Sequence, residues 1–410
     1  MATNRQAAAA DELSCAGPLE CCIGGFAAQL SGQGYAPDTI HAKCALLSDL
    51  NRWLERRQLS LAALDERRLR QFQASRRRRG RMRRGDPATA QQLLQYLRER
   101  GHTAPAVPAI DVHPAAAVVR DFEAFLRSER GLSTATVVSY VTVVHRFLRE
   151  QFGRKALRLD RLRAQDLHRF VVREIQRVSR THGRNTVSAL RSFMRFLLLR
   201  GAVQIDLART LPGVATWRLS HLPQSLLPEQ VEQLLACCDL GSPSGKRDYA
   251  ILLLLARLGL RGGEVLNLLL EDLDWERGEL VVRGKGLRLE RLPLPADVGA
   301  AVARYLHEVR PPCATRRVFV RLIAPYQDLE QSAICCVVRR RLARAGLDPV
   351  HKGAHLLRHS LATNLLRCGA SLSEIGQLLR HRQPTTTQIY AKVDIEALRS
   401  IALPWPGSGS

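Results

Sequence analysis

Long hydrophobic runs are missing from this sequence of 410 residues. The longest strongly apolar stretch without a charged residue extends only from Tyr249 to Ala256, whereas a membrane-spanning helix needs about 20 such residues. The first residues include Arg5, Asp11 and Glu12 and lack the apolar segment of a secretory signal. These absences argue against a membrane protein, and we expect a soluble protein in the cytoplasm.

The sequence also lacks the cysteine and glycine patterns that commonly hold metals and nucleotides. Its ten cysteines include no Cys-x-x-Cys, and six of them form adjacent pairs at positions 21/22, 237/238 and 335/336. Neighbouring side chains on a helix cannot both turn inward, so we interpret the cysteines as reduced, mostly buried small hydrophobic residues. The acidic residues form no carboxylate cluster, and no glycine-rich phosphate loop occurs. We therefore expect no metal ion and no cofactor.

Lysine is scarce, with 6 residues, whereas arginine is abundant, with 56. A GC-rich genome would explain this ratio, but not the excess of 62 basic over 38 acidic residues, which leaves a formal charge of +24. The excess favours a nucleic acid partner, because arginine binds phosphate through paired N–H donors. Seven arginines lie between Arg76 and Arg84, and this run is either a solvated loop or an arm that contacts phosphates.

Apolar residues recur at helical spacing along most of the chain, and part of the pattern occurs twice. In both copies a helix ends near a glycine, a threonine starts the next helix, and an apolar face recurs. The matching positions are 94 to 98 residues apart and include Phe26/Phe122, Leu30/Leu126, Trp53/Phe147, Leu64/Leu162, Leu69/Leu167 and Phe72/Phe170. We interpret this pattern as the duplication of a small helical unit.

Clusters of proline and glycine divide the chain into expected domains. These are a tail (1–25), an N-terminal helical DNA-binding unit (26–102), a second helical unit (115–202), a linker (203–224), a final domain (225–403) and a tail (404–410). In the final domain, Glu279–Arg283 and Arg288–Pro293 predict two short strands joined by Gly284-Lys285-Gly286. The predicted fold is mainly α-helical, with a small antiparallel β-sheet in the final domain.

Four segments of the final domain carry residues suited to phosphate chemistry. They are Gly259–Val265 with Arg261 and Glu264, the turn at Lys285, Ala354–Thr363 with His355, Arg358 and His359, and Leu379–Tyr390 with Arg380, His381 and Tyr390. Two guanidiniums can neutralise the charge that develops on a phosphodiester under attack, and His355 and Arg358 share a helical face. Taken singly, each residue is better explained as an exposed arginine or a structural histidine, and a second His-x-x-Arg pair occurs at His307 and Arg310.

Together and in this order, the segments resemble the tyrosine recombinase (phage integrase) family. The resemblance covers about Leu226 to Val393 and rests on Leu-Arg-x-x-Glu, a Lys in a β-turn, His-x-Leu-Arg-His, and a His nine residues before the Tyr of Thr-x-Ile-Tyr. A weaker resemblance links residues 115–200 to the SAM-like core-binding domain of the family. The family pattern implies a catalytic set of Arg261, Lys285, His355, Arg358, His381 and Tyr390, supported by Glu264.

The resemblance also implies the roles of these residues. Tyr390 would be the nucleophile, Lys285 the general acid that protonates the departing 5′ oxygen, and His381 a hydrogen-bond donor to the phosphate. His355 would bind the phosphate or exchange a proton with the nucleophile, and Glu264 would support the site. Because a phenol with a pKa of about 10 attacks poorly at pH 7, we expect nearby guanidiniums to lower the pKa of Tyr390.

Three features depart from the family pattern. Arg380 stands where the family usually has a glycine, and its side chain would either add a phosphate contact or point outward. His351 and His359 lie close to the motif, so the choice of His355 as the imidazole that faces the phosphate rests on the motif alone. The N-terminal repeat is also unusual, because one core-binding unit is the family norm.

The predicted function is site-specific DNA recombination through a 3′-phosphotyrosine intermediate, for integration, excision or transposition of a mobile element. The partner would be a double-stranded recombination site enclosed by the helical units and the final domain, and bound mainly through its phosphates. The apolar stripe of Ile395, Leu398 and Ile401 would pack in its own protomer or dock on a neighbour. Docking implies a homotetramer on two DNA sites, with other recombinases or accessory proteins as further partners.

Two alternatives to recombination stay open. One is a topoisomerase-like enzyme that nicks and religates DNA without strand exchange, and the other is a catalytically silent DNA-binding protein on a recombinase scaffold. In each case the protein would be cytoplasmic and associated with the nucleoid.

Overall fold

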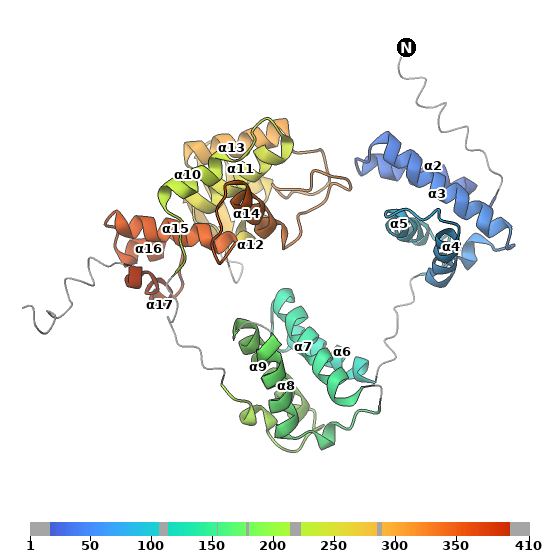
Figure 1. Cartoon of the computed structure of the whole chain (residues 1–410), viewed down its shortest axis with the longest axis horizontal. Helices are drawn as coiled ribbons and strands as arrows, with labels where there is room; N and C mark the ends of the chain where they lie inside the picture. Colours follow the sequence, from blue (N-terminus) through green and yellow to red (C-terminus); the bar gives the residue numbers. More distant parts are fainter. Residues whose placement is uncertain are drawn as a thin grey trace, which may run out of the picture. The chain divides into compact units, whose positions relative to one another are not determined.

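The computed structural model describes residues 17–105, 114–153, 155–177, 180–213, 223–284 and 289–393. The chain forms two compact units, one made of Met1–Ala106 with His221–Ser410 and the other of Val107–Ser220. Figure 1 labels the helices of both units. None of the described helices is long and apolar enough to cross a membrane.

The N-terminal part of the first unit is a small helical bundle. Its helices are α2 (Glu20–Gly32), α3 (Pro37–Glu55), α4 (Glu66–Arg78) and α5 (Asp86–Glu99), with a 3-10 turn η1 (Leu61–Ala63) before α4. Asp65 caps α4, because its side chain accepts a hydrogen bond of 2.7 Å from the backbone N–H of Arg68. The apolar faces of the helices meet in one core that includes Phe26, Trp53 and Phe72.

The second unit contains α6 (Ala115–Ser128), α7 (Thr134–Phe152), η2 (Leu159–Arg161), α8 (Ala164–Arg177), α9 (Arg180–Leu199) and η3 (Leu207–Thr210). Its core is rich in aromatic residues, among them Phe122, Phe147 and Phe170. Val203, Leu207 and Leu211 also belong to this core, although the sequence places them in the linker that follows residue 202.

The two bundles repeat one order of elements: two helices, a 3-10 turn and two more helices. The matched residues are buried in both cores at positions 26/122, 30/126, 54/148, 64/162, 69/167 and 72/170. Trp53 meets Phe72 edge to face at a centroid distance of 5.8 Å, and the matching pair, Phe147 and Phe170, meets edge to face at 5.3 Å. These features support the interpretation of the sequence repeat as a duplicated helical unit.

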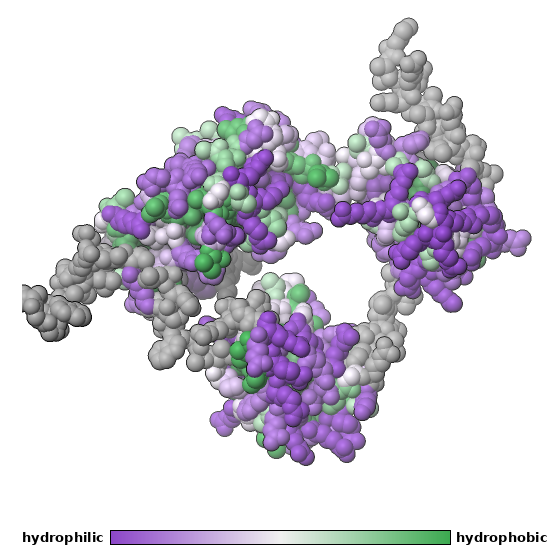
Figure 2. Space-filling model, viewed as in Figure 1, coloured by the Kyte–Doolittle hydropathy of each residue, from purple (hydrophilic) through white to green (hydrophobic). Residues whose placement is uncertain are grey.

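The arginine run at 76–84 is partly helical rather than a loop throughout. Helix α4 continues to Arg78, and Arg76 forms ion pairs with Asp49 and Asp86 that join three segments of the bundle. The other six arginines of the run are exposed, and no ion pair is found for them among the described residues. Figure 2 shows mainly hydrophilic side chains on the face of this bundle that the view presents.

The final part of the first unit holds most of the remaining secondary structure. Its helices are α10 (Pro228–Ala236), α11 (Pro243–Arg257), α12 (Gly262–Asn267), α13 (Ala296–Glu308), α14 (Ala333–Arg344), α15 (Ala354–Arg367), α16 (Leu372–Leu378) and α17 (Pro384–Thr387), with 3-10 turns η4 (Leu270–Asp272) and η5 (Tyr390–Val393). The apolar residues of α11 are buried at the centre, and α13 and α15 pack against this helix.

A three-stranded antiparallel sheet of order β1-β2-β3 accompanies these helices. Its strands are β1 (Leu273–Asp274), β2 (Glu279–Arg283) and β3 (Leu289–Pro293), and Val281 lies opposite Arg291 in the β2–β3 pair. The predicted fold class, mainly helical with a small antiparallel sheet, is confirmed. The bounds of β2 match the prediction and β3 ends at Pro293 as predicted, whereas the short strand β1 was not predicted.

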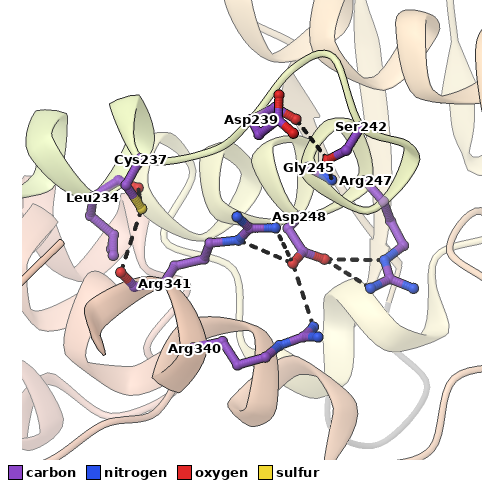
Figure 3. Close-up of polar contacts among 9 residues, drawn as sticks. All are labelled: Leu234, Cys237, Asp239, Ser242, Gly245, Arg247, Asp248, Arg340 and Arg341. Carbon is purple, nitrogen blue, oxygen red and sulfur yellow. Dashed lines mark hydrogen bonds and ion pairs between the residues drawn. The ribbon is translucent and has the colours of Figure 1, made fainter. Parts of the chain in front are cut away.

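A buried carboxylate joins α11 to α14 (Figure 3). The Asp248 side chain is fully buried and accepts hydrogen bonds from Arg247 at 2.9 Å and from Arg341 at 2.8 Å. Arg340 adds a longer contact of 3.5 Å. Three guanidiniums therefore compensate one buried negative charge. These contacts hold α11 and α14 together.

Candidate active site

The first part of the site is the turn between α11 and α12. Gly259 has a φ of +57°, and a Cβ atom there would lie 2.8 Å from the Leu379 side chain, so the turn requires glycine. Arg261 follows at the start of α12, where Glu264 holds it twice. One carboxylate oxygen accepts the backbone N–H of Arg261 at 2.8 Å, and the other accepts its guanidinium at 2.6 Å. The outer part of Arg261 remains partly exposed, with 37% of the side chain accessible.

Arg358 on α15 is the central cation of the site. Its buried guanidinium donates hydrogen bonds to the backbone carbonyls of Gly259 and Leu379, which ties together three segments that are distant in the sequence. Burial and the charges of Arg261 and Arg380 lower the pKa of Arg358 to about 10. The group therefore stays charged at neutral pH and adds a fixed positive charge to the site.

His355 lies one helical turn before Arg358 and reaches solvent. Desolvation by the surrounding side chains and the charges of Arg358 and Arg261 lower the pKa of His355, while Glu264 opposes this shift. A neutral imidazole at this position can either donate or accept a proton, so both roles implied by the resemblance are chemically open to it.

His381 follows α16 and is partly buried. Its Nδ1 atom lies 2.8 Å from the hydroxyl of Thr387, which orients the ring. Burial, together with the charges of Arg358 and Arg261, lowers the pKa of His381 to about 4. The imidazole is therefore neutral at pH 7 and keeps one N–H to donate.

Tyr390 is buried in a small apolar cluster with Ala362, Ile375 and Leu379, and only 1% of the residue is exposed. Its hydroxyl lies 2.8 Å from Nδ1 of His359. Burial raises the pKa of Tyr390 to about 12, and the opposing effect of Arg358 is smaller. Arg358 thus acts on this pKa in the expected direction, but desolvation outweighs the neighbouring charge, so the net shift of the Tyr390 pKa in the resting protein is upward.

The contact between His359 and Tyr390 was not predicted from the sequence. Burial and the nearby His355 and Arg358 lower the pKa of His359 to about 4, so it meets the Tyr390 hydroxyl as a neutral ring. The sequence showed that His359 lies near the motif, but the contact depends on how η5 returns to α15, which no motif encodes. His351, the other nearby histidine, is exposed, and its backbone N–H donates to the side chain of Gln224.

Of the two options that the sequence left open for Arg380, an outward-pointing side chain is wrong, and a phosphate contact stays a prediction. Its backbone has a φ of +54°, and its side chain turns inward and is 5% exposed. The guanidinium meets Glu264 at 2.8 Å and Glu290 on β3 at 3.3 Å. Arg380 therefore binds two carboxylates beside the site instead of pointing into solvent.

Some of the predicted residues lie outside the part of the chain that the structure describes. Lys285 and the stripe of Ile395, Leu398 and Ile401 lie outside the described residues, as do Arg288 and the linker residues 214–222. Strand β2 ends at Arg283 and strand β3 begins at Leu289, and the sequence position of Lys285 falls between them. In the described ranges, no three His, Cys, Asp or Glu side chains cluster as metal ligands would.

Comparisons with known proteins bear on the same regions. Residues 224–396 match the "Phage integrase family", and residues 119–201 match the "Phage integrase, N-terminal SAM-like domain". The chain is 41% identical over 394 residues to the "Putative integrase/recombinase y4rA" of Sinorhizobium fredii, with 95% of each chain covered. The chain belongs to the tyrosine recombinase family. Tyrosine recombinases are DNA strand-transferring enzymes, so the predicted family and enzyme class are confirmed.

Further similarities agree with this assignment. The chain is 32% identical to "Tyrosine recombinase XerD" of Xanthomonas axonopodis pv. citri, over 70% of this chain and 96% of that protein. A crystal structure of XerH site-specific recombinase bound to a palindromic difH substrate aligns with a TM-score of 0.53 at 21% identity, over 69% of this chain and 83% of that chain. A lambda integrase dimer bound to a core site aligns with a TM-score of 0.52 at 16% identity, over 72% and 99%. The two structures support the fold of this recombinase.

Proposed function

We propose that this recombinase exchanges DNA strands at a specific site by forming a 3′-phosphotyrosine bond through Tyr390. The observation that carries the proposal is the convergence on Arg358. This guanidinium is linked to the turn that presents Arg261 and to the segment before His381, and its charge acts on Tyr390. The two proposed cations and the proposed nucleophile thus come from three segments that are distant in the sequence.

The proposed reaction is a transfer between two oxygen atoms. The Tyr390 oxygen attacks the phosphorus and the bond to the 5′ oxygen breaks, while Arg261, Arg358 and His381 stabilise the negative charge on the non-bridging oxygens. His355 binds the phosphate or carries the proton of the nucleophile, and Lys285 supplies a proton to the leaving 5′ oxygen. A 5′ hydroxyl from a partner strand then reverses the step, so the energy of the broken bond is kept in the ester.

The resting position of Tyr390 adds a condition to this mechanism. Because its hydroxyl is buried and bonded to His359, it cannot reach a phosphodiester in the described conformation. We propose that DNA binding withdraws Tyr390 from the apolar cluster and replaces the contact with His359 by a contact with the phosphate. Release from this pocket would also remove the burial that raises the pKa of Tyr390.

We propose a duplex DNA site as the partner of both helical units as well as of the catalytic part. The six exposed arginines of the run at 76–84 support this role for the N-terminal bundle, because they have no described carboxylate partner and can bind phosphates. We also propose that the protein forms a tetramer on two DNA sites and acts in the integration, excision or transposition of a mobile element. Other recombinases or accessory proteins would take part, and the protein would be associated with the nucleoid in the cytoplasm.

Trapping on a nicked half-site tests the chemistry. On a DNA site identified from the flanks of the gene, the wild-type chain should form a covalent protein–DNA adduct without added metal, and Tyr390→Phe should form none. Arg358→Lys should lower the adduct rate by about 10²-fold or more, since a compact ammonium lacks the planar fork that lets one guanidinium hold both carbonyls and still face a phosphate. An adduct that survives in Tyr390→Phe would contradict the proposal.

The same preparation separates the two alternatives. Adduct formation with relaxation of supercoiled plasmids lacking the site would favour the topoisomerase-like enzyme. Specific binding of the site with no adduct would favour the silent DNA-binding protein.

A further inference from the structure

Arg380 occupies a backbone position that disfavours an arginine. Its φ of +54° lies in the left-handed region, where any side chain with a Cβ atom crowds the backbone and where glycine fits best. The residue directly follows the last turn of α16, and its N–H closes that turn on the carbonyl of Gln377 at 2.9 Å. Local structure alone would therefore select glycine, so the side chain of Arg380 needs a separate explanation.

The side chain joins two parts of the catalytic region. One guanidinium nitrogen lies 2.8 Å from Glu264, the carboxylate that also holds Arg261 at the start of α12. The Nε atom lies 3.3 Å from Glu290, which belongs to strand β3 of the hairpin. The Glu264–Arg380–Glu290 bridge thus runs from the phosphate-binding Arg261 to the β2–β3 hairpin through one planar group.

The bridge is not arranged for maximal stability. The Nη1 and Nε atoms of Arg380 are buried and lack a well-aligned hydrogen bond, although Nε keeps its ionic contact with Glu290. Burying N–H groups without such bonds opposes folding, and so does the left-handed backbone. Arg380 thus opposes folding in two ways, yet it links the Arg261–Glu264 pair to the hairpin. We therefore explain Arg380 by its effect on the reaction and not by its effect on folding.

We propose that Arg380 is a positioning residue that holds the β2–β3 hairpin at a fixed place relative to the Arg261–Glu264 pair. The inference rests on the proposed function, in which the residues between these strands supply the proton of the leaving group. Arg380 itself touches no reacting atom. It acts through Glu290 on the hairpin and through Glu264 on Arg261.

The test compares two leaving groups in adduct formation on a nicked half-site. A normal 5′ oxygen must be protonated as it leaves, whereas a bridging 5′ sulfur leaves readily as a thiolate, because thiols ionise with a pKa of about 8.5. Arg380→Gly removes the bridge and relaxes the backbone, and Glu290→Gln removes only its hairpin end. Glu279→Gln is the matched control, because Glu279 is a comparably exposed glutamate on the neighbouring strand and pairs with Arg291 instead.

On the oxygen substrate, we expect Arg380→Gly to lower the rate about 10- to 100-fold and Glu290→Gln about 3- to 10-fold, as misplacement of a catalytic element does. On the sulfur substrate, both variants should come within about threefold of the wild type, and Glu279→Gln should match the wild type on both. Melting temperatures of the three variants should stay close to that of the wild type, which separates positioning from loss of folding.

Two outcomes would overturn the inference while the proposed function stands. One is an equal defect of Arg380→Gly on both substrates, and the other is a Glu290→Gln rate no lower than that of Glu279→Gln. If the wild-type chain forms no adduct on either substrate, the proposed function fails and the role of Arg380 fails with it.

Discussion

Tyr390 and His359 face each other inside the resting protein, with 2.8 Å between the phenol oxygen and Nδ1 and 5.6 Å between the ring centroids. Burial raises the pKa of Tyr390 to about 12 and lowers that of His359 to about 4. Both groups are therefore uncharged at neutral pH, which suits an apolar pocket. The pair therefore keeps the Tyr390 phenol, the proposed nucleophile, in its protonated form.

This pair and His381 predict how stability depends on pH. In the folded protein, His359 and His381 have pKa values of about 4, against 6.5 for an ordinary histidine. Between these values the unfolded chain binds more protons, so the stability present above about pH 6.5 should decrease as the pH falls toward 4. Each histidine contributes at most about 1.4 kcal/mol per pH unit.

Urea denaturation at a series of pH values measures this slope. His359→Asn keeps a polar partner for Tyr390 but cannot titrate in this range, so its slope should be shallower than that of the wild type. The matched control is His307→Asn, which makes the same substitution at an exposed histidine. Identical slopes for His359→Asn and the wild type would refute the prediction.

Asp248 should be essential for folding of the catalytic region. Asp248→Asn would leave Arg247 and Arg341 without the buried charge that compensates them (Figure 3). Removing one partner of a buried ion pair typically costs about 3–5 kcal/mol. Glu308→Gln removes an acid from a half-exposed pair with Lys246 and should cost much less stability, because exposed ion pairs are screened by solvent. Chemical denaturation of both variants tests the contrast, and equal losses would contradict it.

Two glycines with similar backbone angles should respond differently to alanine. Gly259 and Gly278 have φ values of +57° and +62°, but a Cβ atom would approach Leu379 at 2.8 Å at the first position and meet nothing within 4 Å at the second. Both variants bear a backbone cost of about 1–2 kcal/mol, and Gly259→Ala adds an overlap of roughly 1–3 kcal/mol. Only Gly259→Ala should also slow adduct formation, because the backbone carbonyl of residue 259 accepts a hydrogen bond from Arg358 and would shift with the turn.

The arginine run should divide into structural and DNA-binding members. Replacing the exposed Arg77, Arg79 and Arg81 together by glutamine should leave stability within about 0.5 kcal/mol of the wild type. If they bind phosphates, the slope of log affinity against log salt should fall by up to about 0.9 for each lost contact. Arg76→Gln should instead lower stability, because Arg76 pairs with Asp49 and Asp86 inside the bundle. An unchanged salt slope in the triple variant would exclude the run from the interface.

Residue type and order carried much of the information about the site. The order of cationic and phenolic residues along the chain was enough to select the residues of the candidate site. In the structure these residues lie in one region and affect one another electrostatically: Arg261, Glu264, Arg358, His381 and Tyr390. The strand β2 was also predictable, since the short apolar run Leu280–Val282 beside a Gly-Lys-Gly turn depends only on local sequence.

Other features depend on contacts between distant segments. The partner of Tyr390 is His359, 31 residues away along the chain, and the sign of the Tyr390 pKa shift follows from burial by α15 and α16. The direction of the Arg380 side chain depends on Glu264 and Glu290, which come from two other elements. A run of arginines suggests a loop, but Asp65 caps a helix that extends to Arg78. In each case tertiary packing, which periodicity does not record, decided the outcome.

The 1% exposure of Tyr390 has a consequence for the cell. An enzyme with a strongly basic surface will collide with chromosomal DNA continually, and an open nucleophile would leave nicks wherever such collisions lasted. Under the proposed function, the burial of the phenol together with Leu379 and Ile375 would keep brief encounters with the genome harmless. Only an encounter long and specific enough to rearrange the end of the chain would proceed to breakage.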